Sequence, residues 1–570
     1  MKRTYILSLS FFFCISATYA QNDKLGTISV DIVKPYTPTI ADVQKSVEET
    51  PKKDSVTITK KKITYTIHSV PVASTFVPEK GKAVRVNTAQ QRDTLYHSYL
   101  ALGAGSYTSF LADAFVAVPL SASSDFSVDL QHHSSQGKIK EVPLDTDFAN
   151  TQAQAAYRYG NSQYQLGAIA GINHRLLHWY GVEDKSFLPI ENSLKQNYLS
   201  GGLSAYFSLN NSIFKGADFS VQGIKDDFSS GETHLQLKPS FLWNFNEQQA
   251  VKARLDLDYL QGSFANGFSV SDKIGYKVAL LGIKPAYQFS NELFSGRLGL
   301  GAYYLKQNKG DSGTFKLFPD LELAYDALGD GLIIYGGITG DLKQVTYREK
   351  TQENPYLSPT QDIQPTYTPY HIFIGVKGAL TQGFSYDVNV FYDRVEGLPL
   401  FQANEKLSLT QYKTYQYDNT YKLLYQDVMR YGIQANLLGK ISDQFTLDFS
   451  MQAMDFSMDK NAEQPWNIPS FTTGLTAYYQ LIPNWNIGTT LFYVGERKDL
   501  KHTLVTSPKE EVTLKGFFDL NFSTDYTFLK RWTVFVNFNN VTGKHYERWT
   551  NYPVQGFQVL GGLKYRFNVK

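Results

Sequence analysis

A two-residue alternation of apolar and polar side chains recurs through most of this chain of 570 residues. The clearest case is the stretch 251–259, VKARLDLDY, in which every second residue is apolar and the four residues between them are charged. A period of two residues predicts a β-strand with one apolar and one polar face. Four charges on one face of so short a strand cannot lie in a dry core, so this face must meet water.

A closed barrel in a membrane satisfies both faces of such strands. Its outer face contacts lipid, its inner face surrounds water, and closure leaves no unpaired strand edge in the bilayer. The alternation recurs about twenty times after residue 95, so the sequence predicts an all-β transmembrane antiparallel barrel over residues 96–570. The charges of the stretch above are then expected to face the lumen, where they either line a path for a solute or form a solvated wall. These residues are Lys252, Arg254, Asp256 and Asp258.

The strand count follows from the alternating stretches and from the connections between them. We expect twenty-two strands, provided that residues 418–440 form one long strand. Short connections alternate along the chain with long ones such as 343–365. In bacterial barrels the count is even, the short turns face the periplasm and the long loops face outward, so both ends of the barrel chain are expected at the periplasmic side. Pro319 cannot donate to a strand ladder and predicts a bulge or a loosened pairing at its position.

Residues 1–20 have the features of a secretory signal peptide. Two basic residues near the start precede an apolar core over residues 6–15, and Ala20 closes a small-residue exit. The apolar core is too short to span a bilayer as a helix. The single cysteine, Cys14, lies inside this signal, so the mature chain is expected to have no disulfide and no cysteine-based site. The net charge of +2 and the lack of a basic run argue against nucleic acid as a partner.

Residues 21–95 differ in composition from the rest and are expected to form a short N-terminal leader, periplasmic or inside the lumen. Residues 48–54, EETPKKD, are charged and contain a proline, so they predict a flexible tether. Residues 27–33 are an extended, β-prone stretch near the expected mature N-terminus: Thr27, Ile28, Ser29, Val30, Asp31, Ile32 and Val33.

The C-terminal hairpin resembles the closing hairpin of TonB-dependent receptor barrels. The matching residues are Asn539, Asn540, Tyr546, Tyr552, Pro553, Gly556, Gly562 and Phe567. The likeness continues loosely back to about residue 96, although this chain runs three residues beyond its last aromatic residue. The leader is similar to those of variants of the family without a full plug domain. By this resemblance, residues 27–33 are either a box that pairs strand to strand with the energising TonB protein or a leader strand without a partner.

The resemblance implies a receptor in the bacterial outer membrane of a Gram-negative organism that takes up a solute. It also implies outer-membrane lipid and the barrel-assembly machinery as partners, with TonB or a periplasmic or lipoprotein partner as a further one. Two alternatives stay open, an accessory barrel subunit of an outer-membrane complex and a passive porin. A lumen of this width must be closed by the leader, by the outer loops or by a partner.

The sequence does not predict an enzyme, a cofactor or a metal site. No motif for a nucleophile elbow, a zinc protease or a phosphate-binding loop occurs in the required context. His132 and His133 could bind a metal ion, but adjacent strand residues point to opposite faces and the spacing places no third ligand, so the sequence favours the reading without a metal.

Overall fold

The computed structural model describes residues 96–182, 194–269, 272–308, 312–381, 383–405, 407, 412–458, 464–501 and 510–569. The expected signal peptide 1–20 and leader 21–95, including the stretch 27–33, lie outside these ranges. Within the described ranges, none of the helical structure has both the length and the apolar character needed to cross a membrane.

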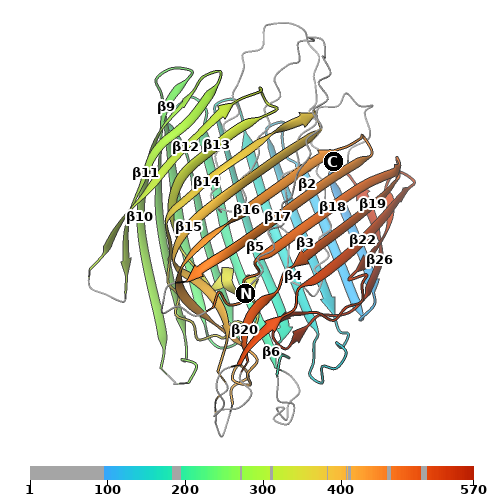
Figure 1. Ribbon diagram of the computed structural model, residues 1–570. Helices are drawn as coiled ribbons and strands as arrows, with labels where there is room; N and C mark the ends of the chain where they lie inside the picture. Colours follow the sequence, from blue (N-terminus) through green and yellow to red (C-terminus); the bar gives the residue numbers. More distant parts are fainter. Residues whose placement is uncertain are drawn as a thin grey trace, which may run out of the picture.

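Twenty-two antiparallel strands form one sheet that closes on itself as a barrel of tilted strands (Figure 1). In chain order the barrel strands are β1 Ser98–Gly105, β2 Ser109–Pro119, β3 Ser124–Ser135, β4 Phe148–Gly160, β5 Tyr164–His178, β6 Lys195–Leu209, β7 Phe214–Asp226, β8 Gly231–Asn244, β9 Gln249–Phe264, β10 Ile274–Ser290, β11 Phe294–Gln307, β12 Thr314–Asp326, β13 Ile333–Lys343, β14 Thr366–Thr381, β15 Phe384–Ala403, β16 Tyr421–Lys440, β17 Phe445–Met458, β18 Phe471–Ile482, β19 Trp485–Val494, β22 Phe517–Phe528, β23 Trp532–Asn539 and β26 Gln558–Phe567. The predicted fold class and strand count are confirmed, and the stretch 418–440 contains a single strand, β16.

Four further strands and one helix lie in the long loops. They are β20 Arg497–Lys501 paired with β21 Glu510–Leu514, β24 Glu547–Trp549 paired with β25 Tyr552–Pro553, and the helix α1 Tyr347–Glu353. The long loops gather at one end of the barrel, which we call the loop end, and the short turns gather at the other. Figure 1 shows β20 at the loop end and the C-terminus at the opposite end, as the even strand count requires.

The barrel closes where the last strand pairs with the first. In this seam Leu100 is opposite Tyr565, and Leu102 is opposite Leu563. A side chain on Gly562 would place its Cβ 2.3 Å from the carbonyl oxygen of Leu102, so this seam accepts only glycine there without a backbone shift. Beyond Phe567, Asn568 Oδ1 accepts a hydrogen bond of 2.8 Å from the backbone N–H of His97.

The outer face of the barrel is an apolar belt. Leu281 and Ile283 on β10 are 53% and 45% exposed, and Leu298 and Leu300 on β11 are both 46% exposed. Soluble proteins rarely expose contiguous apolar surface on this scale, whereas a transmembrane barrel carries such a belt against lipid. The alternation in the sequence therefore separates a lipid face from a lumen face.

Pro319 loosens the sheet on one side only. On the β11 side the register is continuous and includes the pair Leu300 with Pro319. On the β13 side the pairing begins at Asp320, directly after the proline. The irregularity in this region lies on β13, between Thr339 and Asp341, where the register with β14 shifts. The predicted loosened pairing is confirmed, whereas no bulge occurs in the β11–β12 register.

Candidate functional site: the loop cap

At the loop end the long connections fold together into one cluster of buried side chains. We define the loop cap as residues 179–182, 344–365, 412–420, 495–501 and 540–557, from five different loops. Its apolar core continues the buried residues at the loop ends of the wall strands. The largest members from the cap and the adjoining strands include Trp179, Tyr198, Tyr347, Leu357, Tyr415, Tyr421, Trp549 and Tyr552. The sequence left open whether the leader, the outer loops or a partner closes the lumen. The structure shows the outer loops packing across this end.

Three tyrosines from three loops meet at the centre of the cap. The ring of Tyr356 stacks on that of Tyr552 with centroids 3.5 Å apart, and Tyr180 contacts Tyr552 edge-on at 4.9 Å. The Tyr180 hydroxyl donates to the carbonyl oxygen of Pro553 at 3.0 Å, and the Tyr552 hydroxyl donates to that of Asn419. Offset and edge-on aromatic pairs contribute beyond the area that they bury. These contacts hold the loops to one another as well as to the wall.

The helix α1 is attached at its N-terminus to a carboxylate on the wall. Glu232 on β8 is 5% exposed, and its two oxygens accept from the backbone N–H groups of Tyr347 and Arg348 at 2.7 and 3.0 Å. The hydroxyl of Thr346 caps the next N–H group, that of Glu349, at 3.0 Å. The first N–H groups of a helix lack intrahelical acceptors and carry partial positive charge, so a carboxylate is a favourable partner.

The C-terminal end of α1 is attached by donors from the wall and the cap. Arg175 on β5 donates to the carbonyl oxygen of Thr351. The indole of Trp179 and the hydroxyl of Tyr198 both donate to the carbonyl oxygen of Pro355, at 3.1 and 3.0 Å. A cation at a helix C-terminus is favoured by the helix dipole. The helix is therefore fixed to the barrel at both ends, with charges of the appropriate sign.

A buried aspartate joins the cap segments 495–501 and 540–557. Asp499 on β20 is fully buried and accepts hydrogen bonds from the hydroxyl groups of Tyr421, at 2.9 Å, and Thr550. Burial raises the pKa of this carboxyl, although the hydrogen bonds from Thr550, Leu500 and Tyr421 oppose the rise.

Arg497 reinforces this junction between the two loops. Its guanidinium donates to the backbone carbonyl oxygens of Arg548 and Glu547 at 2.7 and 3.0 Å. Hydrogen bonds from a charged donor are stronger than neutral ones, so the side chain ties β20 to β24.

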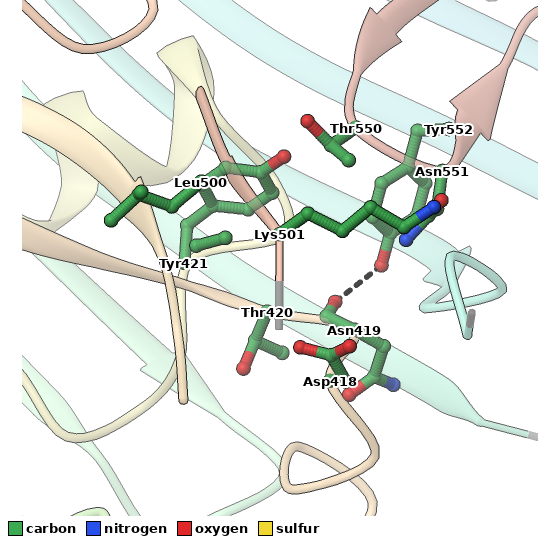
Figure 2. Close-up of a pocket in the computed structure, with 10 residues that line it drawn as sticks. Asp418, Asn419, Thr420, Tyr421, Leu500, Lys501, Thr550, Asn551 and Tyr552 are labelled. Carbon is green, nitrogen blue, oxygen red and sulfur yellow. Dashed lines mark hydrogen bonds between the residues drawn. The ribbon is translucent and has the colours of Figure 1, made fainter. Parts of the chain in front are cut away.

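A small recess opens in the cap between three loops (Figure 2). Its lining includes Asn419, Tyr421, Lys501 and Tyr552, and Figure 2 shows the bond from the Tyr552 hydroxyl to Asn419 at its edge. The recess has a cavity volume of about 10 Å³, which is room for about one water molecule. It is therefore not a pocket for a solute.

The charged residues predicted to line the lumen lie in a network of ion pairs. Asp256 is 7% exposed and accepts from Arg254 Nε at 3.0 Å, with Lys284 Nζ at 3.7 Å. Asp258 is 9% exposed and lies 2.8 Å from His234 Nε2. Lys252, on the same strand, is partly buried. The structure thus brings acidic and basic side chains on β8, β9 and β10 together.

The residues that resemble the receptor closing hairpin fall into two groups. Gly562 and Phe567 lie in β26 at the seam, and Asn539 ends β23. The others build the cap. Asn540 Nδ2 donates to the carbonyl oxygens of Lys544 and Gln555, and the ring of Tyr546 stacks on Phe517 at 3.8 Å. Tyr552 and Pro553 form β25, and Gly556 packs against the ring of His545.

The two adjacent histidines have separate surroundings. His132 lies 2.8 Å from the hydroxyl of Thr151, whereas His133 is buried and packs against Phe148. Within the described part of the chain, no group of three or more potential metal ligands is present.

Sequence reasoning missed α1 and its attachment to the wall. One signal was available, because Thr346 and Glu349 have the spacing of a helix capping box. The role of Glu232 had no such signal, since it lies 115 residues from Tyr347 in the sequence.

A closed barrel of 22 strands is a fold found among large outer-membrane proteins. Among solved structures, the chain is similar to the FrpB iron transporter from Neisseria meningitidis, with a TM-score of 0.64 and 13% identity over 83% of this chain and 82% of that one. It is also similar to the siderophore receptor PirA from Acinetobacter baumannii, with a TM-score of 0.61 and 11% identity over 84% and 81% of the two chains.

A third similar structure is the ferric-catecholate import receptor Fiu from E. coli K12, with a TM-score of 0.59 and 10% identity over 83% and 82% of the two chains. No family model matches the sequence, and no curated protein matches it. The chain therefore shares the fold of the TonB-dependent iron and siderophore receptors, and at these identities the likeness concerns the fold alone.

Proposed function

We propose that this protein is an outer-membrane receptor that imports a solute with energy from TonB. The observation that carries the proposal is the closed barrel of 22 strands whose outer loops pack across one end. A barrel of this size is wide enough for a bulky solute, and its closed end requires a regulated rather than a free passage. The similar receptors carry iron or ferric chelates by their names, so we propose a metal chelate as the solute class.

The loop cap argues against the passive porin. A porin needs a continuous aqueous path, whereas in the described loops the side chains of Tyr180, Tyr356 and Tyr552 pack in direct contact across the loop end. The accessory-subunit alternative has no observation in its favour in the described residues.

We propose that residues 27–33, which lie outside the described residues, are the segment that pairs with TonB. Strand addition requires backbone N–H donors in register, and proline removes one of them. Ile32→Pro should therefore abolish energised uptake while the barrel still inserts. Val43→Pro is the matched control, because it places a proline in the same leader outside the proposed segment.

The test is iron accumulation from a panel of ferric chelates in cells that carry the wild-type gene, no gene, Ile32→Pro or Val43→Pro. The panel contains a catecholate, a hydroxamate and a citrate complex, each with labelled iron. We expect one chelate to be accumulated by wild type and Val43→Pro only, with equal amounts of heat-modifiable barrel in all three expressing strains. Accumulation that is independent of the gene for every chelate would exclude the proposed solute class.

A further inference from the structure

Two lysines lie on the outer face of the barrel at its loop end. They are Lys277 on β10 and Lys306 on β11, and both are exposed. Their neighbours in the chain, Tyr276, Val278 and Leu305, are only 2–3% exposed and belong to the buried core that continues into the cap. Because adjacent strand residues point to opposite faces, Lys277 and Lys306 point away from the lumen.

The height of Lys306 on the barrel follows from the apolar belt below it. On β11 the exposed apolar side chains of the outer face run from Phe294, 48% exposed, to Tyr304, 46% exposed, and Lys306 is the next residue on that face. Over that length a strand with a rise of about 3.3 Å per residue and a tilt of about 40° climbs about 25 Å. This is the height of the apolar band of an outer-membrane barrel, and the long loops of such barrels face outward. Lys306 therefore lies at the level of the lipid headgroups of the outer leaflet.

The strand register brings the two lysines together. The strands β10 and β11 are neighbours in the wall (Figure 1), and Lys306 is opposite Ala279, two residues from Lys277 on the same face. Diagonal neighbours across an antiparallel pair are about 7–8 Å apart, a separation that two long side chains can close around one anion. Gln261 on β9 is opposite Lys277, and its Oε1 accepts from the Tyr259 hydroxyl at 2.9 Å, which leaves its amide nitrogen as a further donor.

Neither lysine has a counter-charge in the part of the chain that the structure describes. No described carboxylate lies within ion-pair distance of Lys277 or Lys306, and Asp272, in the loop before β10, is exposed. A lysine on the lumen face behaves differently, since Lys284 Nζ lies 2.8 Å from a carboxylate oxygen of Asp341. Two neighbouring cations repel each other, so an anion bound between Lys277 and Lys306 would stabilise this surface.

One more lysine continues the row along the rim of the barrel. Lys225 on β7 is exposed and is opposite Leu199, which is 47% exposed on the outer face. An acidic side chain is present here, because Asp227 follows two residues later and is also exposed. The positive charge is therefore balanced in part at Lys225, and the centre of the basic surface is the pair Lys277 and Lys306.

We propose that the outer face at Lys277 and Lys306 binds the phosphate of an outer-leaflet lipid. The lysine ammonium binds phosphate as a point charge, and the lysine stem packs on apolar surface. Directly below, Leu281 is opposite Tyr304 and is 53% exposed, so the acyl chains of the same molecule contact the apolar belt. Charge and apolar surface together fit a phosphorylated lipid, whereas a free phosphate uses the charge alone. The proposal concerns the exterior of the barrel and does not depend on the solute.

The experiment is a lipid titration of the purified full-length barrel in a neutral detergent, with bound lipid measured by native mass spectrometry. The probes are diphosphoryl lipid A and the same lipid after removal of its phosphates. Wild type should bind the phosphorylated lipid more tightly. The double variant Lys277→Gln/Lys306→Gln should lose about 30-fold in affinity for it, whereas Lys277→Arg/Lys306→Arg keeps both charges and should bind as wild type does.

Single variants keep the test decisive if the double glutamine variant does not insert. Lys277→Gln and Lys306→Gln should each lose about fivefold in affinity. Lys215→Gln is the matched control at the turn end of β7, where this lysine donates to the carbonyl oxygen of Asn210 at 2.8 Å, and its affinity should equal that of wild type. Glutamine variants that bind as wild type does would overturn the proposal, as would equal binding of the lipid with and without its phosphates.

Inorganic phosphate distinguishes a lipid site from a site for free anions. It should displace the lipid from wild type no more than sodium chloride does at equal ionic strength. Stronger displacement would mean that the lysines bind a free anion, and the lipid assignment would be wrong. Lipid binding that depends on the two lysines, without gene-dependent accumulation of any chelate, would leave this surface intact and exclude only the proposed solute class.

Discussion

Replacing the wall carboxylate that holds α1 should loosen the loop cap without unfolding the barrel. The two carboxylate oxygens of Glu232 accept the N–H groups of Tyr347 and Arg348. Glu232→Gln keeps one of these oxygens but removes the charge and the second acceptor. The hydroxyl of Tyr276 also donates to this carboxylate, at 2.7 Å. The amide nitrogen of glutamine would face donors that already point at the site.

The size of the effect follows from the lost interactions. A hydrogen bond to a charged group contributes about 1.5–3 kcal/mol, and the charge at the helix N-terminus adds up to roughly 2 kcal/mol in a partly buried site. Since glutamine retains one bond, we expect the free energy of opening α1 to fall by about 2–3 kcal/mol, which corresponds to roughly 30- to 140-fold faster exchange. The backbone N–H groups of Lys350 and Asn354 donate to the carbonyl oxygens of Thr346 and Lys350, so their exchange reports the opening of α1.

Hydrogen exchange of the detergent-solubilised barrel, measured by mass spectrometry, reports the free energy of opening α1. Peptides that cover 347–354 should exchange faster in Glu232→Gln, whereas those of β26 should not change. Glu396→Gln is the matched control, because this wall carboxylate contacts Arg394 and Lys316 and no cap residue in the described contacts. Equal exchange of the α1 peptides in wild type and Glu232→Gln would refute the attachment of the helix to the wall.

Four further predictions test the barrel, the cap and the leader. Phe449→Arg places a charge in lipid at a cost of roughly 2–4 kcal/mol, whereas Ser450→Arg points to the lumen, so only the first should lower the yield of heat-modifiable barrel. Deletion of 555–570 removes the seam strand and should abolish insertion, which the recovery of a protease-resistant barrel would contradict. Burial raises the pKa of Asp499, so the folded state favours the protonated carboxyl. The stability that this carboxyl contributes is present below the usual pKa of about 3.9 and is lost as pH rises through the raised pKa. Asp499→Asn should therefore raise the thermal midpoint relative to wild type at pH 8 and less so at pH 4, and a difference that does not depend on pH would exclude this assignment. If the cap alone closes the lumen, deletion of 21–95 with the signal retained should leave the conductance in planar bilayers small, whereas a large steady conductance would assign closure to the leader.

The strands were predictable because each one carries its own evidence. In β17 the alternation of Phe445, Leu447 and Phe449 with polar neighbours identifies both the strand and its lipid face without reference to any other part of the chain. The seam was predictable for a related reason, since a membrane barrel tolerates no open edge and the first and last strands must pair. The alternation does not define the strand ends as closely: β26 begins at Gln558, although the apolar positions of its alternation already include Phe557.

The loop cap was not predictable because its contacts are not periodic and not local. The bond between Tyr180 and Pro553 joins residues 373 positions apart, and that between Tyr552 and Asn419 spans 133. The sequence around a loop tyrosine does not show whether its side chain faces water, lipid or another tyrosine. The resemblance to a closing hairpin placed Tyr552 and Pro553 among barrel residues, although they fold away from the wall into the cap.

The distribution of paired and unpaired charge relates the wall to the cap. Along the wall, carboxylates and cations on neighbouring strands neutralise one another, as Asp256 does with Arg254 and Lys284. Such pairs do not attract a particular solute, because their fields cancel within a short distance. In the cap, Arg175 and Arg497 donate instead to backbone carbonyl oxygens of other segments, those of Thr351, Arg548 and Glu547. The positive charge there holds loop segments together, whereas along the wall it balances carboxylates on neighbouring strands.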